Sequence, residues 1–529
     1  MFGVRNSNNL MTIKRIILIL LTVLAILTSG SRLYETLQEP QYQSRLELYQ
    51  TDIVLEAAAW KPEKDDKNYQ GAQNAILGAN PTESAAEQYS EARQKAKTAI
   101  EKTKQRIEKL RQPVAQQQNE VNLKQASQNQ LDLKVLLKSL DEQQKILTEL
   151  ELRLGVLQAE LSKTDLALAT WEQVEQRKLT FPDMSQTARV LSGLWGNTKQ
   201  LLPNAEELIQ SQLNGWFKMH ALTQLYTLQE RSEALKSLEV LQQQQAEKAL
   251  LQLSIVGVVP NLAGLIGFVM LIFLLVQRLL KGKDSILATN STLAWTTPWN
   301  GETILQVFVG GFFLMGQILV PIAFSLLPLP RPAGNIRLQA VYVLISYILL
   351  AAGSISVLYF SIKPFLPLND DWFRFRLGGK WILWGLGGYC VAIPIVLFVS
   401  LVNQQIWQGQ GGSNPLLQLA LEAKDSAALG IFFTTAAIAA PLFEEFLFRG
   451  FLLPSLTRYM PVSASIMVSS FIFAAAHLSL SEILPLTSLG IILGIVYTRS
   501  RNLLAPMMLH SLWNSGTLLT LFVLGSSNS

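Results

Sequence analysis

The sequence predicts an all-α fold: a polytopic helical membrane bundle of about eight spans after an N-terminal signal anchor, with an exported helical coiled-coil domain. Hydrophobic residues make up 49% of the 529 residues and charged residues only 16%, a composition typical of a membrane protein. Long apolar runs dominate the chain from Leu253 onward, whereas Gln, Glu, Lys and Leu dominate residues 31–249. This contrast predicts a membrane bundle joined to a polar helical region.

The N-terminal run predicts an export signal. Ile16–Leu27 is apolar, follows Lys14 and Arg15, and precedes the small residues Thr28–Ser31. A spanning helix needs about 20 residues, so an uncleaved anchor and a signal peptide cleaved after about Gly30 both stay open. In either case we expect the following residues to be exported.

The polar region carries a heptad pattern. Leucine recurs at every seventh residue, at Leu133, Leu140, Leu147, Leu154, Leu161 and Leu168. The positions three residues later are mostly apolar, with Gln143 and Thr164 as interruptions. The pattern predicts a coiled-coil helix of about 64 residues, from about Pro113 to about Gln176 and roughly 95 Å long. A helical hairpin that packs on itself is the alternative, with a second helical stretch at about 204–252 as an intramolecular partner.

The remaining chain divides into regions and spans. The expected regions are 1–30 as signal anchor or signal peptide, 31–249 as coiled-coil region, 250–380 as the first spans, and 381–529 as the core with the candidate site. The expected spans are 253–277, 303–327, 338–361, 381–403, 427–452, 463–480, 483–498 and 503–524.

Basic residues predict the orientation of the spans. Most of those near span ends fall on one side: Arg278, Lys281, Lys283, Lys363, Arg374, Arg376, Lys380, Arg449, Arg458, Arg499 and Arg501. The positive-inside rule makes this side cytoplasmic, with Arg331 and Arg337 as exceptions. The coiled-coil region is then expected on the non-cytoplasmic side of an integral membrane, either a bacterial inner membrane or a related internal membrane.

Charge and cysteine content exclude several classes of protein. The net charge of +5 is small and its basic residues are dispersed, so no nucleic-acid partner is expected. Cys390 is the single cysteine, so an intrachain disulfide and a cysteine metal cluster are both excluded.

Ionisable residues recur inside the last apolar runs. They form three motifs: Glu-Glu-x-x-x-Arg at 444–449, Phe-x-x-x-His at 473–477 and His-x-x-x-Asn at 510–514. Ionisable side chains are costly inside a membrane, so they mark a functional site by default. At 1.5 Å per helical residue, Glu444 and His477 lie about 18 and 22 Å from one membrane face, with His510 shallower at about 10 Å. The three motifs are therefore expected to converge.

The spacing within each motif suggests a role. Glu445 and Arg449 are four residues apart and predict a supporting ion pair, which leaves Glu444 free to act with His477 on a water molecule. His510 and Asn514 share one helix face and suit the oxyanion of a carbonyl under attack. The structural alternatives are an ion pair alone and hydrogen bonds that merely join helices.

The ordered motifs resemble the CPBP family of intramembrane proteases, which includes the CAAX prenyl endopeptidases and the bacterial Abi proteins. The resemblance covers roughly residues 380–525, the core expected at 381–529. It implies an endopeptidase in which Glu444 and His477 activate water, His510 and Asn514 hold the oxyanion, and Glu445 with Arg449 supports the site. A metal-free glutamate-type reaction is favoured, and the alternative is a divalent metal such as zinc on Glu444, His477 and His510.

The implied partners are membrane lipid and a protein or peptide substrate cut in or beside the membrane. The coiled-coil region adds a coiled-coil partner or self-association as a further expectation. Two other functions stay open: a non-catalytic scaffold or immunity factor, and a proton-coupled transporter, which the lack of repeated polar motifs disfavours.

Overall fold

The computed structural model describes residues 13–37, 43–61, 77–111, 121–196, 199–326, 335–407, 411–412, 419 and 425–525. Every regular element in these ranges is helical, as expected. The chain divides into two compact units. Among the described residues, the membrane unit comprises residues 13–37 and those from Val256 to Gly525, and the polar unit comprises those from Ser44 to Ile255.

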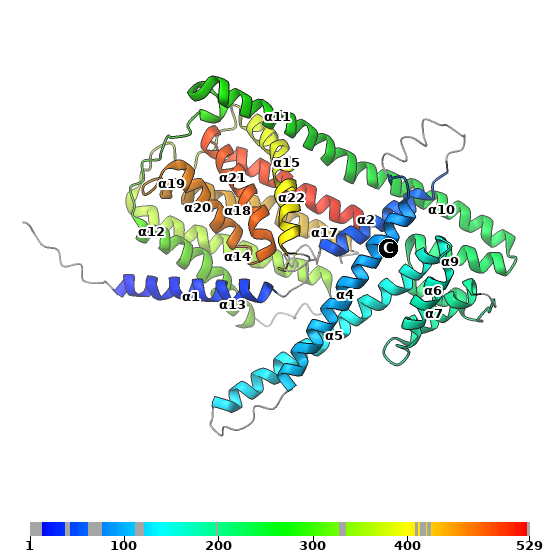
Figure 1. Cartoon of the computed structure of the whole chain (residues 1–529). Helices are drawn as coiled ribbons and strands as arrows, with labels where there is room; N and C mark the ends of the chain where they lie inside the picture. Colours follow the sequence, from blue (N-terminus) through cyan, green and yellow to red (C-terminus); the bar gives the residue numbers. More distant parts are fainter. Residues whose placement is uncertain are drawn as a thin grey trace, which may run out of the picture. The chain divides into compact units, whose positions relative to one another are not determined.

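The polar unit is built on a long helical hairpin. Its helices are α2 (Gln43–Ala58), α4 (Pro81–Arg111), α5 (Val121–Glu160), α6 (Thr164–Glu175), α7 (Pro182–Trp195), α8 (Ala205–Gln212), α9 (Gly215–Leu228) and α10 (Ser232–Leu253). Helices α4 and α5 lie side by side (Figure 1). Arg93 pairs with Glu151, and Thr103 bonds to Gln143, so the two helices run antiparallel.

The prediction of one continuous helix from 113 to 176 is wrong, because the described part of it is divided into two helices. Helix α5 ends at Glu160, and Ser162 takes a left-handed φ of 60° in the turn before α6. Helix α6 then folds back on α5, where the indole nitrogen of Trp171 donates to the Leu152 carbonyl at 3.1 Å. Gly155 permits this contact, because a Cβ there would lie 2.2 Å from Trp171 Nε1. The heptad leucines therefore continue across a turn. The long helix does pack in a hairpin, but its antiparallel partner is α4 and not the expected stretch at about 204–252.

Buried charges in the polar unit are paired. The fully buried Glu151 accepts from Arg93 of α4 at 2.9 Å, and its Oε2 lies 2.7 Å from Nη1 of Arg177 in the turn after α6. Asp52 of α2 accepts from Tyr89 at 2.6 Å and lies 3.3 Å from Arg153. These pairs join three helices around one apolar core.

The membrane unit follows the expected succession of apolar helices. They are α1 (Ile13–Thr36), η1 (Ser254–Val258), α11 (Val259–Lys281), α12 (Gly301–Leu305), η4 (Gln306–Phe313), η5 (Met315–Leu319), α13 (Val320–Leu326), α14 (Ile336–Ile362), α15 (Trp381–Trp407), α17 (Ser426–Phe433), η7 (Thr434–Ala439), α18 (Ala440–Glu445), η8 (Phe446–Leu452), α19 (Leu453–Leu456), α20 (Val462–Ala475), α21 (Ile483–Ser500) and α22 (Leu504–Gly525).

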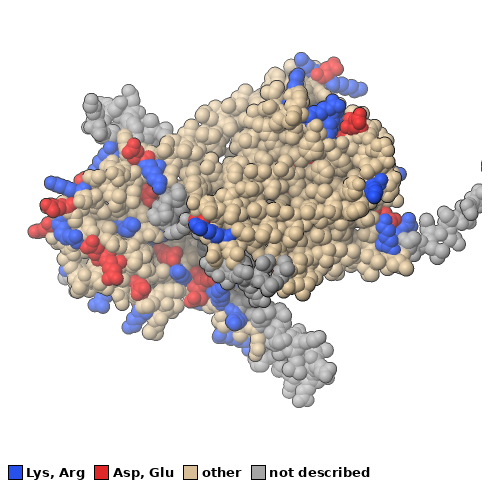
Figure 2. All heavy atoms as spheres, turned by 180° about the vertical axis from the view of Figure 1, so that it is seen from behind, with Lys and Arg blue, Asp and Glu red and all other residues tan. Residues whose placement is uncertain are grey.

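Seven helical segments of the described residues are long and apolar enough to cross a membrane. They include α1 and six of the eight later spans that the sequence predicts. The expected span 463–480 is instead a shorter apolar helix, α20, and the expected span 503–524 corresponds to the 22-residue α22. Figure 2 shows a broad surface of the membrane unit that carries no charged side chains. The charged side chains lie at the margins of this surface. The protein is an integral, multi-pass membrane protein.

Several basic residues between spans lie together at one end of the membrane unit, whereas Arg337 pairs with Asp425 at the other end of α14. Arg458 donates to the Trp299 carbonyl, Arg499 to that of Leu287, and Arg501 to that of Leu293. Lys14 and Arg15, before the apolar part of α1, pair with Glu302 at the same end. Arg449 is the exception to the expected charge pattern, because it is buried within the bundle.

Candidate active site

A single helical run carries both adjacent glutamates. It extends from Ser426 to Leu456 and alternates α-helical with π-helical turns, so that Glu444 and Glu445 close α18 immediately before the π segment η8. Asp425 caps its start by accepting from the Ala428 backbone N–H at 3.0 Å. π-Helical turns within α-helices are frequent at functional sites because they redirect side chains.

Glu444 presents a half-buried carboxylate. The Tyr347 hydroxyl, from α14, donates to its Oε1 at 3.0 Å. Its Oε2 lies 3.9 Å from Nε2 of His510. The side chain keeps 16% exposure, so this carboxylate is accessible from the interior of the bundle.

Glu445 is fully buried and holds two partners. Its Oε1 lies 2.7 Å from Nη1 of Arg449 and 2.8 Å from Nδ1 of His510. A carboxylate accepts hydrogen bonds, so Nδ1 of His510 carries the hydrogen and Nε2 faces Glu444. Arg449 also donates to the Gly490 carbonyl at 3.2 Å and stacks on the Phe473 ring, with its guanidinium carbon 4.5 Å from the centroid. The i,i+4 ion pair of the sequence is thus present, and it also anchors His510.

His477 lies just after the end of α20. Its Nδ1 is 2.9 Å from the Phe473 carbonyl, which accepts, so Nδ1 carries the hydrogen and Nε2 is an acceptor. The buried Phe473 ring packs edge-on against both imidazoles, at 5.0 Å from His477 and 5.7 Å from His510. Phe473 therefore packs against both histidines.

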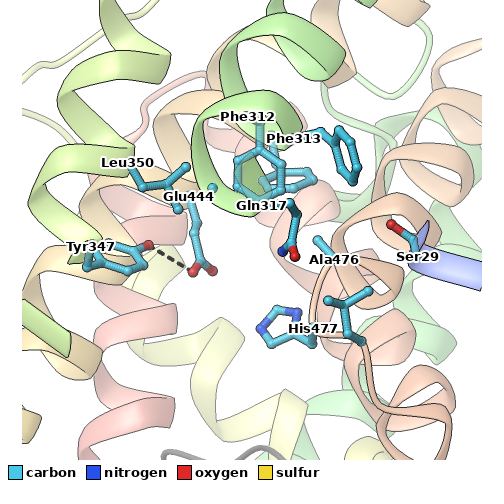
Figure 3. Close-up of a pocket in the computed structure, with 12 residues that line it drawn as sticks. Ser29, Phe312, Phe313, Gln317, Tyr347, Leu350, Glu444, Ala476 and His477 are labelled. Carbon is cyan, nitrogen blue, oxygen red and sulfur yellow. Dashed lines mark hydrogen bonds between the residues drawn. The ribbon is translucent and has the colours of Figure 1, made fainter. Parts of the chain in front are cut away.

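Glu444 and His477 line one pocket of about 210 Å³. Its lining is Ser29, Phe312, Phe313, Gly316, Gln317, Tyr347, Leu350, Glu444, Phe448, Ala476, His477 and Leu478. In Figure 3 the Glu444 carboxylate and the His477 ring both point into this space, with the Gln317 amide beside them. The structure thus brings together the two residues that the sequence pairs for water activation.

Three polar residues of this pocket were missed in the sequence. Ser29 comes from α1, Gln317 from η5 and Tyr347 from α14. None of the three belongs to a motif: Gln317 is a single polar residue in an apolar run, Tyr347 follows Ser346, and Ser29 lies among the small residues after the first apolar run. A polar residue in a membrane span can indicate a functional site, but this indication is weak when the side chain is uncharged.

His510 lies beside the pocket, with its Nε2 3.9 Å from Oε2 of Glu444, and Asn514 is on the same helix. Neither is among the residues that line the pocket. Asn514 donates its amide to the Ala436 carbonyl at 2.8 Å, from α22 to η7. One N–H of the Asn514 amide thus joins two helices.

The zinc alternative depends on how the side chains of Glu444, His477 and His510 are arranged. Among the residues that the structure describes, no group of three His, Cys, Asp or Glu side chains is arranged to hold a metal ion. His477 directs Nδ1 at a backbone carbonyl, and His510 directs Nδ1 at Glu445. Each Nδ1 is thereby engaged, which leaves the Nε2 atoms of the two rings to contact a ligand.

The part of the chain that carries this site is similar to a family of membrane proteases. Residues 426–516 match the family model described as type II CAAX prenyl endopeptidase Rce1-like, which spans all three motifs. The "Membrane-embedded CAAX protease MroQ" of Staphylococcus aureus (strain USA300) is 27% identical over 210 residues, 38% of this chain and 83% of MroQ. The "Putative membrane peptidase YdiL" of Bacillus subtilis (strain 168) is 24% identical over 137 residues, 26% of this chain and 55% of YdiL. No solved structure matches. The resemblance to the CAAX prenyl endopeptidases is confirmed.

Proposed function

We propose that this chain, whose residues 426–516 form an Rce1-like CAAX protease domain, is an intramembrane endopeptidase of the glutamate type. Its substrate is a membrane-associated protein or peptide. The observation that carries the proposal is the shared pocket of Glu444 and His477, two ionisable side chains from separate helices inside an apolar bundle. Ionisable side chains are costly inside a membrane, so such a pair marks a functional site by default.

The two residues divide the activation of water. Oε1 of Glu444 is occupied by Tyr347, so Oε2 is the oxygen that accepts a proton from the water. The second hydrogen of that water is donated to Nε2 of His477, whose Nδ1 is fixed by the Phe473 carbonyl. The water oxygen then attacks the carbonyl carbon of the peptide bond. Glu444 returns the proton to the departing amine, and the carbonyl side keeps the second hydrogen of the water, so the reaction yields a carboxylic acid and an amine, which become a carboxylate and an ammonium by proton exchange.

The oxyanion is assigned to His510 and Asn514. Nε2 of His510 lies on the Glu444 side of the ring and donates to an oxyanion when the ring is the imidazolium. The Glu445 carboxylate at Nδ1 stabilises that cation. Asn514 contributes the amide N–H that Ala436 does not use.

The pocket walls suggest which part of a substrate enters. Phe312, Phe313, Leu350 and Phe448 provide an apolar lining beside the two reactive groups. A substrate is therefore expected to present apolar side chains next to the scissile bond. The region of a peptide that lies in or beside the bilayer has this character.

Comparative proteomics of membranes tests the proposal. Membranes with the native chain should contain cleavage products that are missing with Glu444→Ala and still present with the control Asp370→Ala. Asp370 is an exposed carboxylate in a loop of the same unit. Unchanged products with Glu444→Ala would support the scaffold alternative, and loss of a solute flux without any missing product would support the transporter.

A further inference from the structure

Tyr347 lies outside residues 426–516, the segment that matches the protease family, and it contacts Glu444, the proposed base, directly. It belongs to α14, 97 residues before Glu444, and its hydroxyl lies 3.0 Å from Glu444 Oε1. The same tyrosine lines the pocket. Its ring packs edge-on against Phe443, with ring centroids 5.9 Å apart. Both ends of this side chain are therefore held, the ring by packing and the hydroxyl by the carboxylate.

The hydrogen bond has a defined direction and therefore a defined effect. An ionised carboxylate only accepts, so the hydroxyl of Tyr347 must donate. A glutamate side chain has several rotatable bonds, and a lone half-exposed carboxylate would sample many orientations. The donated bond restricts Glu444 to orientations in which Oε1 faces α14. Oε2 then faces away from Tyr347, and Figure 3 shows the carboxylate directed into the pocket toward His477.

We propose that Tyr347 is the positioning residue of Glu444, and that α14 thereby completes a site whose other reacting groups all lie within residues 426–516. This inference rests on the proposed function, because positioning matters only if Glu444 takes a proton from water. Tyr347 itself does not touch the reacting atoms. Its contribution is to keep Oε2 available at the geometry that proton transfer requires.

Tyr347→Phe is the direct test, because it removes the hydroxyl and keeps the ring against Phe443. With a substrate identified by the membrane comparison above, we expect kcat to fall about 10- to 100-fold, the range for a displaced catalytic group. KM and the melting temperature should be unchanged. The control is Tyr342→Phe on the same helix, whose ring packs on Phe324 at 4.1 Å and does not line the pocket.

A double variant separates positioning from a structural role. Glu444→Asp shortens the carboxylate and withdraws it from the hydroxyl, so adding Tyr347→Phe should change kcat by less than about twofold in that background. A kcat for Tyr347→Phe equal to that of the native chain, or an equal loss in both backgrounds, would overturn the positioning role. Full cleavage by Glu444→Ala would instead overturn the proposed function itself, so the two failures are distinguishable.

Discussion

Nδ1 of His510 lies 2.8 Å from Oε1 of Glu445, a contact between residues 65 positions apart in the chain. The same oxygen accepts from Arg449 at 2.7 Å. Glu445 therefore joins the helices of two motifs and determines which nitrogen of His510 faces Glu444. The adjacent glutamates thus have separate tasks, one anchoring the site and the other facing the pocket.

Removal of the Glu445 charge should destabilise the membrane unit. Glu445→Gln leaves Arg449, which has 0% exposure, without its anionic partner. An uncompensated buried charge costs about 3–5 kcal/mol, so we expect a clear fall in melting temperature in detergent. The matched control is Glu142→Gln, which removes the exposed partner of Lys138. Equal melting temperatures for Glu445→Gln and Glu142→Gln would contradict the anchoring role.

Gln317 should contribute to substrate recognition. Its amide points into the pocket beside Glu444 and His477, where it can bond to a peptide group (Figure 3). Gln317→Leu keeps the approximate volume and removes that bond, so kcat/KM should fall about 10-fold, the value of one hydrogen bond of roughly 1.4 kcal/mol. Gln306→Leu, at the start of the preceding η4 segment, is the control. The role is refuted by a kcat/KM for Gln317→Leu equal to that of the control.

The first helix should remain attached in the active protein. Ser29 of α1 lines the pocket, Thr36 accepts from the Leu480 backbone N–H at 3.4 Å, and Lys14 pairs with Glu302. Cleavage after about Gly30 would remove Ser29 from the pocket. We therefore expect the mass of the protein isolated from membranes to include residues 13–36. If the active protein had the mass of a chain that begins after Gly30, α1 would not be part of the active protein.

The polar unit should lose stability as the pH rises. Burial raises the pKa of Glu56 from 4.5 to about 8; nearby Asp52 adds to the rise, and Lys248 and Lys218 oppose it. The folded state therefore holds a proton on Glu56 that the unfolded state releases, so the contribution of Glu56 to stability is greatest below pH 4.5 and is lost as the pH rises to about 8. Glu56→Gln, which mimics the protonated form, should raise the melting temperature at pH 9 and leave it nearly unchanged at pH 5. An equal effect at both pH values would contradict the raised pKa.

Much of the site could be predicted because its residues belong to short helical motifs. Spacing within a helix determines which side chains share a face, so the ion pair of Glu445 with Arg449 follows from the sequence alone. The bond from Glu445 to His510 does not, because it depends on how two distant helices pack. Ser29, Gln317 and Tyr347 reach the pocket in the same way, from helices joined to it only through the tertiary fold.

The error in the polar unit has a local cause. The leucine heptads pass through Leu161 and Leu168, and no proline or glycine marks the end of α5 between them. The break arises at Ser162, whose left-handed φ is compatible with a turn that lets Trp171 pack on Gly155. The free energy gained by burying one large aromatic side chain exceeds that of continuing the helix. The heptad periodicity describes only the helix, so it cannot predict the break.

The central claim is that Glu444 and His477 act on one water molecule. Single variants Glu444→Gln and His477→Ala, and the double variant, should be compared for cleavage of one identified substrate by the purified full-length protein. Residues that act as a unit are strongly non-additive, so the account predicts that the double variant is no slower than the slower single variant. Multiplicative losses in the double variant, or native cleavage by either single variant, would contradict it.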